Sequence, residues 1–214
     1  MATTTMQTTR GRRPADLRAR LERLPATFTY TQARRLGLSE HSLYRLRDSH
    51  LIEPLGRGLY ERTDLTGDEP DGADHDLLAI AARAPRATLC LRSALARHEL
   101  IDDIPAEIDI ALPRGTRAPA LDAPISWHRF DSATFDLGRD LLDLGAGQSI
   151  GLYSPERCIA DAFRLAGNEG PELGNEALRR WLRRRGSSPA QLLKLAAQLP
   201  RAESSLRRSL QILL

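Results

Sequence analysis

The sequence is poor in cysteine and aromatic residues and has no long apolar run. Two cysteines, Cys90 and Cys158, are too few for a disulfide framework or a structural zinc site, so we expect buried thiols in a reducing compartment. No run of about 18 apolar residues is present, which argues against a transmembrane helix. The Thr-rich residues 1–9 are followed by no apolar segment, which argues against a signal peptide. These absences predict a cytoplasmic protein without a membrane partner.

The net charge of +3 is small, but its distribution along the chain is uneven. Residues 1–62 hold 12 arginines against six acidic residues, and residues 177–214 hold nine basic residues against Glu203 alone. The segment 63–76 has six acidic residues, is rich in Gly and Pro, and contains no Lys or Arg. We therefore predict a basic N-terminal domain (1–62), an acidic linker (63–76) and a second domain (77–214). Two basic ends around an acidic middle can mark a nucleic-acid-binding surface.

The first domain has the pattern of a winged helix-turn-helix. A leucine stripe predicts a helix over residues 14–24. Thr29 is placed to cap a short second helix, with Gln32 completing a capping box. Gly37 then allows a sharp turn, and Ser39 caps the third helix.

The third helix, predicted over residues 40–50, turns Leu43 and Leu46 toward the core and a polar face outward. The second helix of a helix-turn-helix enters the major groove of DNA with its N-terminal residues first. Arg45 is suited to pair with guanine, and Tyr44 is assigned to a phosphate. The candidates for contact with base edges are Ser39, His41, Ser42 and Arg45.

A hairpin is predicted after this helix, because two short apolar pieces flank Gly56-Arg57-Gly58. Such a wing would place Arg57 against the DNA backbone or in the minor groove. Arg12 and Arg13, together with Arg10, would form a basic arm. The alternative is a three-helix module whose hairpin binds a protein.

The second domain is predicted to be mixed α/β, which makes the whole chain α+β. Helices are expected over 89–100 and 202–212, and strands over 107–112, 125–130 and 150–153. Ser154-Pro155-Glu156 has the composition of a helix start.

No catalytic constellation, metal site or cofactor site is predicted in this domain, and we expect no enzyme. Glu107 and Asp109 are interpreted as an exposed strand face, and Asp161 as an ion-pair partner of Arg157 or Arg164. His98 and His128 are interpreted as structural. Gly145-Ala146-Gly147 does not lie between a strand and a long helix, so it is no phosphate loop.

A second basic surface is predicted near the C-terminus of the chain. It is either a solvated helix face or a contact for phosphates, belonging to DNA beyond the wing or to a structured RNA. Its residues are Arg179, Arg180, Arg183 and Arg184.

The first domain contains Leu36-Gly37-Leu38-Ser39 and Gly56-Arg57-Gly58-Leu59-Tyr60. The second contains Ser93-Ala94-Leu95, Ile104-Pro105, Ile108–Gly115 and the block Tyr153–Phe163. In these motifs the sequence resembles the AbiEi family of type IV antitoxins, with Cys158 standing where Thr is more usual.

The resemblance implies a two-gene toxin–antitoxin system, which guards against phage. The winged helix would bind inverted repeats in its own promoter and repress it, two protomers pairing on the DNA even if the chain is a monomer in solution. The second domain would counteract a nucleotidyltransferase toxin, with or without a stable complex. Two rival functions are a toxin-binding module that does not bind DNA and, less well supported, an enzyme that modifies the toxin. A general RNA-binding protein would need more exposed aromatic residues.

Overall fold

The computed structural model describes residues 14–56, 58–64, 75–145, 148–165, 167 and 171–213. The chain divides into two compact units, residues 1–73 and 74–214. Each has its own hydrophobic core. Residues 65–74 of the predicted linker lie outside the described residues, and His75 and Asp76, also assigned to it, already belong to a helix.

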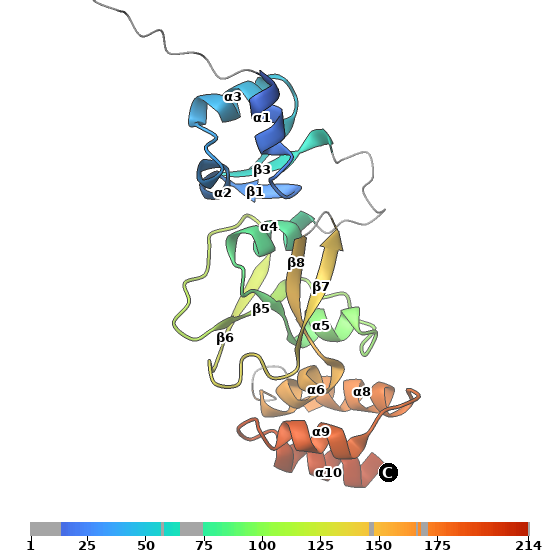
Figure 1. The fold of residues 1–214 in the computed structure, drawn as a ribbon. Helices are drawn as coiled ribbons and strands as arrows, with labels where there is room; N and C mark the ends of the chain where they lie inside the picture. The colour runs from blue at the N-terminus through green and yellow to red at the C-terminus, as the bar shows by residue number, and fades with distance from the viewer. Residues whose placement is uncertain are drawn as a thin grey trace, which may run out of the picture. The chain divides into compact units, whose positions relative to one another are not determined.

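The first unit is a three-helix module with a small sheet (Figure 1). Its strands are ordered β1-β3-β2 and pair antiparallel. The described elements are α1 (Pro14–Leu21), β1 (Thr27–Thr29), α2 (Tyr30–Arg35), α3 (Glu40–Asp48), β2 (Ile52–Gly56) and β3 (Leu59–Arg62). The predicted helix-turn-helix with a hairpin wing is therefore the fold of this unit.

The local signals in the first unit act as the sequence predicts. Thr29 and Gln32 form the capping box of α2, and the Ser39 hydroxyl accepts a hydrogen bond from the backbone N–H of Ser42 at the start of α3. Gly37 has a φ of +76°, in the left-handed region where a side chain is unfavourable. The predicted ends of two helices were wrong. Helix α1 ends at Leu21, and α3 ends at Asp48 because His50 adopts a left-handed φ of +53°.

The second unit contains a five-stranded mixed sheet of order β6-β5-β4-β8-β7. The pairs β4–β8 and β5–β6 are parallel, and the other pairs are antiparallel. The strands are β4 (Thr88–Leu89), β5 (Ile108–Pro113), β6 (Ile125–Phe130), β7 (Arg139–Gly145) and β8 (Gln148–Tyr153). The sequence predicted β5, β6 and β8 but not β4 or β7.

Helices lie beside the sheet and at one of its ends (Figure 1). Helix α4 contacts β8 and α5 contacts β5, whereas the described helices from α6 to the C-terminus gather where β8 ends. The described helices are α4 (His75–Arg83), α5 (Leu91–Arg97), α6 (Pro155–Arg164), α8 (Pro171–Leu182), α9 (Pro189–Ala196) and α10 (Glu203–Leu213). The predicted α+β class is confirmed.

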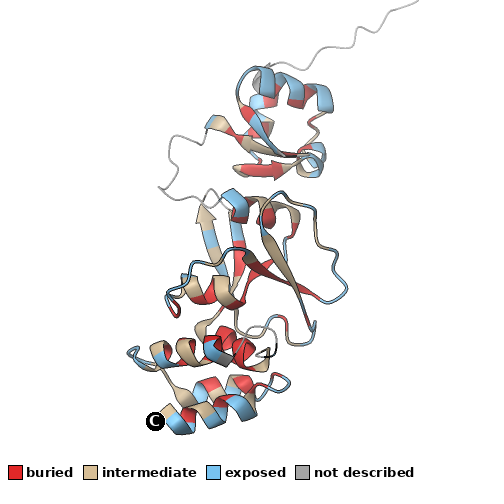
Figure 2. Cartoon of the chain, turned by 180° about the vertical axis from the view of Figure 1, so that it is seen from behind, coloured by how far each residue is buried: buried red, intermediate tan, exposed pale blue. Residues whose placement is uncertain are grey.

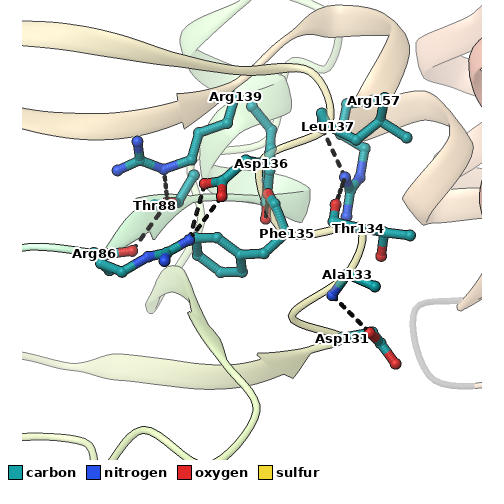
Figure 3. A network of polar contacts seen from close by, with 11 residues as sticks. Arg86, Thr88, Asp131, Ala133, Thr134, Phe135, Asp136, Leu137, Arg139 and Arg157 are labelled. Atoms are coloured by element: carbon teal, nitrogen blue, oxygen red, sulfur yellow. Dashed lines mark hydrogen bonds and ion pairs between the residues drawn. The ribbon is translucent and has the colours of Figure 1, made fainter.

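Helix α6 is buried over almost its whole length (Figure 2). Ser154 caps it and Pro155 occupies its first turn, as predicted. The guanidinium of Arg157 is fully buried and donates to Asp161 Oδ2 at 2.9 Å. It also donates to the backbone oxygens of Thr134 and Leu137, both at 2.7 Å (Figure 3). Arg157 thereby fastens the loop 131–138 to α6.

Candidate nucleic-acid interface

The outward face of α3 is polar and is held in place by a buried apolar stripe. Leu43 and Leu46 are 3% and 2% exposed and pack into the core of the first unit. His41 and Arg45 are exposed, as predicted, and no partner is found for the side chain of either within the described residues. A rigid helix that presents unpaired donors to solvent is the arrangement that major-groove recognition requires.

Three predicted contact residues differ in how they are placed. Tyr44 is 48% exposed and is therefore accessible on the outward face of α3. Ser42 is only 7% exposed, and its hydroxyl lies 2.8 Å from that of Ser39. One of the two hydroxyls donates to the other, and this hydrogen bond gives the Ser42 hydroxyl a partner where it is buried. Ser39 and Ser42 are therefore less accessible to a base than His41 or Arg45.

Arg45 lies on the side of α3 that faces α1. It lines an open hollow of about 660 Å3 together with Arg18 of α1 and Asp48. The other side of α3 faces the wing and carries Tyr44 and Arg47. The polar face of α3 is therefore flanked by arginines on both sides.

Three predicted contact residues, Arg12, Arg13 and Arg57, lie outside the described residues. The hairpin that carries Arg57 is present, because β2 and β3 pair on either side of it. The roles of these three arginines remain predictions.

The second basic surface is only partly free for a ligand. Arg180 pairs with Asp102 and with Glu176, and the Asp102 carboxylate raises the pKa of Arg180 through a hydrogen bond. Arg184 donates to the backbone oxygen of His98. Arg179 and Arg183 are exposed, and no partner is found for the side chain of either within the described residues.

The carboxylates that were considered for catalysis are paired, with one exception. Asp109 is 8% exposed and accepts from His128 Nε2 at 2.8 Å, so its predicted place on an exposed face was wrong. The imidazole of His128 lets this carboxylate be buried. Asp161 accepts from both arginines considered, Arg157 and Arg164. Glu107 is exposed and precedes β5.

The remaining structural predictions concern His98, the two cysteines, metal ligands and membrane spans. His98 Nε2 lies 2.8 Å from the backbone oxygen of Tyr153, a structural role as predicted. Both cysteines are buried. The described residues contain no group of three or more potential metal ligands, and no described helix is long and apolar enough to cross a membrane.

Sequence reasoning did not include three residues on the wing side of α3: Tyr30, Arg47 and Tyr60. The structure brings them together with Tyr44. One signal was present for Arg47, since it follows Tyr44 by three positions and so shares its side of the helix. The position of Tyr60 in the second strand of the wing, two residues after Gly58, was the other available signal.

One comparison with known proteins concerns the first unit. A sequence model described as "Transcriptional regulator, AbiEi antitoxin" matches residues 16–63. Among solved structures, the crystal structure of the RV2827C protein from Mycobacterium tuberculosis is 20% identical, covering 94% of this chain and 82% of that chain with a TM-score of 0.47. None of the curated proteins compared with this chain matches it.

Proposed function

We propose that the chain represses its own operon and counteracts a toxin, from the premise that residues 16–63 match the sequence model of a transcriptional regulator described as an AbiEi antitoxin. The winged helix would bind inverted repeats in the promoter, with one protomer on each half-site. Residues 77–214 would counteract a nucleotidyltransferase-type toxin, with or without a stable complex. Both roles place the protein in the cytoplasm, as part of a type IV system for phage defence.

The observation that carries this proposal is the exposed polar face of α3. His41, Tyr44 and Arg45 point away from a core built by Leu43 and Leu46. The wing beside α3 supplies the second contact that a single short helix needs for stable binding. A mobility-shift assay with the DNA upstream of the gene tests the proposal: a discrete complex supports it, and no shift at low salt contradicts it.

Replacing Arg45 with alanine is expected to weaken binding to the promoter repeat about tenfold, because a forked arginine contact to a base contributes about 1–3 kcal/mol. Binding to an unrelated duplex should change little. Fluorescence anisotropy with both duplexes measures the two effects. Arg23→Ala is the charge-matched control, since Arg23 is an exposed arginine of the turn after α1. Equal losses from both variants on both duplexes would contradict a base contact by Arg45.

A second expectation concerns Arg57 at the tip of the wing. Its proposed contact is with the DNA backbone, which carries no sequence information. Arg57→Ala should therefore weaken binding to the promoter and to an unrelated duplex by the same factor, measured by anisotropy at fixed salt. A loss confined to the promoter would instead assign Arg57 to base recognition.

The affinity for any duplex is expected to fall steeply as salt rises. If three phosphates are contacted, the logarithm of the binding constant should fall with a slope of about −2.7 against the logarithm of the salt concentration. Titrations at four salt concentrations, with the promoter and with an unrelated duplex, measure the slope. A flat response would remove the electrostatic part of the proposal.

The second basic surface would add phosphate contacts through Arg179 and Arg183. Their exposure and their lack of partners within the described residues support this role. Arg180 and Arg184 are less suited to it, because both already bind groups on the α5–β5 connection. The sequence left two phosphate sources open for this surface, DNA beyond the wing and a structured RNA.

Counteraction of a toxin is tested by co-expression with the neighbouring gene. Growth that depends on this chain supports the antitoxin role. Growth that is independent of it contradicts that role. A complex with the toxin without any shift of promoter DNA would favour the rival function, an interaction module that does not bind DNA.

A further inference from the structure

A small hollow separates α3 from the wing. Its volume is about 110 Å3, and tyrosines from three different elements line it: Tyr30 of α2, Tyr44 of α3 and Tyr60 of β3. The other lining residues are Glu40, Leu43 and Arg47. None of the three tyrosine hydroxyls has a hydrogen-bond partner within the described residues. The three tyrosine hydroxyls and the Arg47 guanidinium can all donate hydrogen bonds. They therefore line a hollow that contains a single carboxylate, that of Glu40.

Arg47 is held over this hollow by Tyr44. Its guanidinium carbon lies 5.0 Å from the centre of the Tyr44 ring, a cation–π distance. Its ion-pair partner is Asp48, at 3.5 Å and with a 69% exposed side chain, so the pair is weak. Stacking on Tyr44 limits the motion of Arg47 while leaving most of its N–H groups available. This arrangement suits a ligand with several acceptor oxygens.

The other two tyrosines are fixed by the sheet. The Tyr60 ring stacks on the buried Phe28 with a centroid distance of 5.7 Å. The backbone N–H of Tyr30 donates to the oxygen of Gly58 at 2.8 Å, which ties the start of α2 to the wing. Burial, with smaller contributions from Tyr44 and Glu40, raises the pKa of the Tyr60 hydroxyl. That hydroxyl therefore stays a hydrogen-bond donor at neutral pH.

We propose that this hollow binds a phosphodiester group of the duplex, with Arg47 and the hydroxyls of Tyr30, Tyr44 and Tyr60 as donors. The inference rests on the proposed DNA-binding function. A phosphate offers only acceptor oxygens, which the three hydroxyls and the guanidinium match. The hollow lies between the recognition helix and the wing, where a backbone strand passes if both elements contact DNA. The contact would fix the register of α3 without reading sequence.

Replacing Glu40 is expected to change the affinity for DNA in the opposite direction to replacing Arg47. Its exposed carboxylate lines the same hollow and would repel a bound phosphate. Removing its charge should therefore strengthen binding to every duplex, while removing the charge of Arg47 should weaken it. A purely structural role for the hollow predicts neither change.

The experiment measures the affinity of the full chain for the promoter duplex and for a scrambled duplex of equal length. Arg47→Gln is expected to weaken both about fivefold to tenfold and to reduce the salt slope by about 0.9. Tyr44→Phe and Tyr60→Phe should each weaken both about twofold to fivefold. Glu40→Gln should tighten both about twofold. Arg47→Lys should recover part of the loss, because it restores the charge but not the fork.

Several outcomes would overturn the inference. A loss confined to the promoter duplex would make the hollow a base-reading site and leave the proposed function intact. Normal DNA binding by every variant, combined with lost protection against the toxin, would assign the hollow to a protein partner. A wild-type chain that binds neither duplex would overturn both proposals. Circular dichroism melting curves, matched to wild type, show that the exposed Arg47 and Glu40 variants are folded.

Discussion

Replacing Arg157 with methionine is expected to lower the free energy of unfolding of the second unit by about 3–5 kcal/mol, the typical cost of removing one partner from a buried ion pair. The side chains of Arg157 and Asp161 are both 0% exposed. The change would leave the Asp161 carboxylate buried with Arg164 alone, and the backbone oxygens of Thr134 and Leu137 without their donor. Urea unfolding followed by tryptophan fluorescence measures the effect.

Two features of the chain make this measurement selective. Its two tryptophans, Trp127 and Trp181, both lie in the second unit, so the signal does not report on the winged helix. The matched control is Arg207→Met, because Arg207 pairs with Glu203 at the same i, i+4 spacing but is 54% exposed. That variant should lose about 0.5 kcal/mol or less. Similar losses from the two variants would show that burial of the pair does not determine its contribution.

Replacing Gly138 with alanine is expected to cost the same unit about 2–4 kcal/mol. Gly138 has a φ of +65°, and a methyl group placed there would lie 2.9 Å from the Cβ atom of Arg157. The Cβ atom of Arg157 is bonded directly to the backbone of α6, so it cannot move aside unless the helix shifts. Backbone strain of about 1–2 kcal/mol adds to the cost of the close contact. The measurement is the same urea titration.

Gly115→Ala separates these two contributions. Gly115 has a φ of +88°, but an added Cβ would meet nothing within 4 Å. The variant should therefore lose only the strain, about 1–2 kcal/mol. Equal losses at positions 115 and 138 would indicate that strain alone decides, and that the packing of the loop against α6 contributes nothing measurable.

The first unit was predictable from sequence because its signals are local. The capping box at Thr29, the left-handed turn at Gly37 and the N-cap at Ser39 each depend on neighbouring residues. The same holds for the outward face of α3, apart from Ser42. Ser42 is buried with its hydroxyl next to that of Ser39, a contact that a helical wheel does not show.

The missed parts of the second unit depend on distant contacts. Strand β4 has only two residues, Thr88 and Leu89, and exists because it pairs with both β5 and β8. Strand β7 lies at the edge of the sheet, and its sequence RDLLDLG lacks regular alternation because only part of it is covered. The hollow beside α3 was missed for the same reason: Tyr30, Tyr44 and Tyr60 are brought together only by folding.

The Tyr153–Phe163 block, the most distinctive part of the second unit's sequence, contains the ion pair of Arg157 and Asp161, which lies wholly inside the protein. If the chain counteracts a toxin as proposed, a genetic selection for alleles that fail to protect cells would be expected to collect changes at both positions. Such alleles would fail through proteolysis of a destabilised chain and not through loss of a surface contact. Abundance in cell extracts, measured for each allele, would separate them from changes at residues that touch a partner.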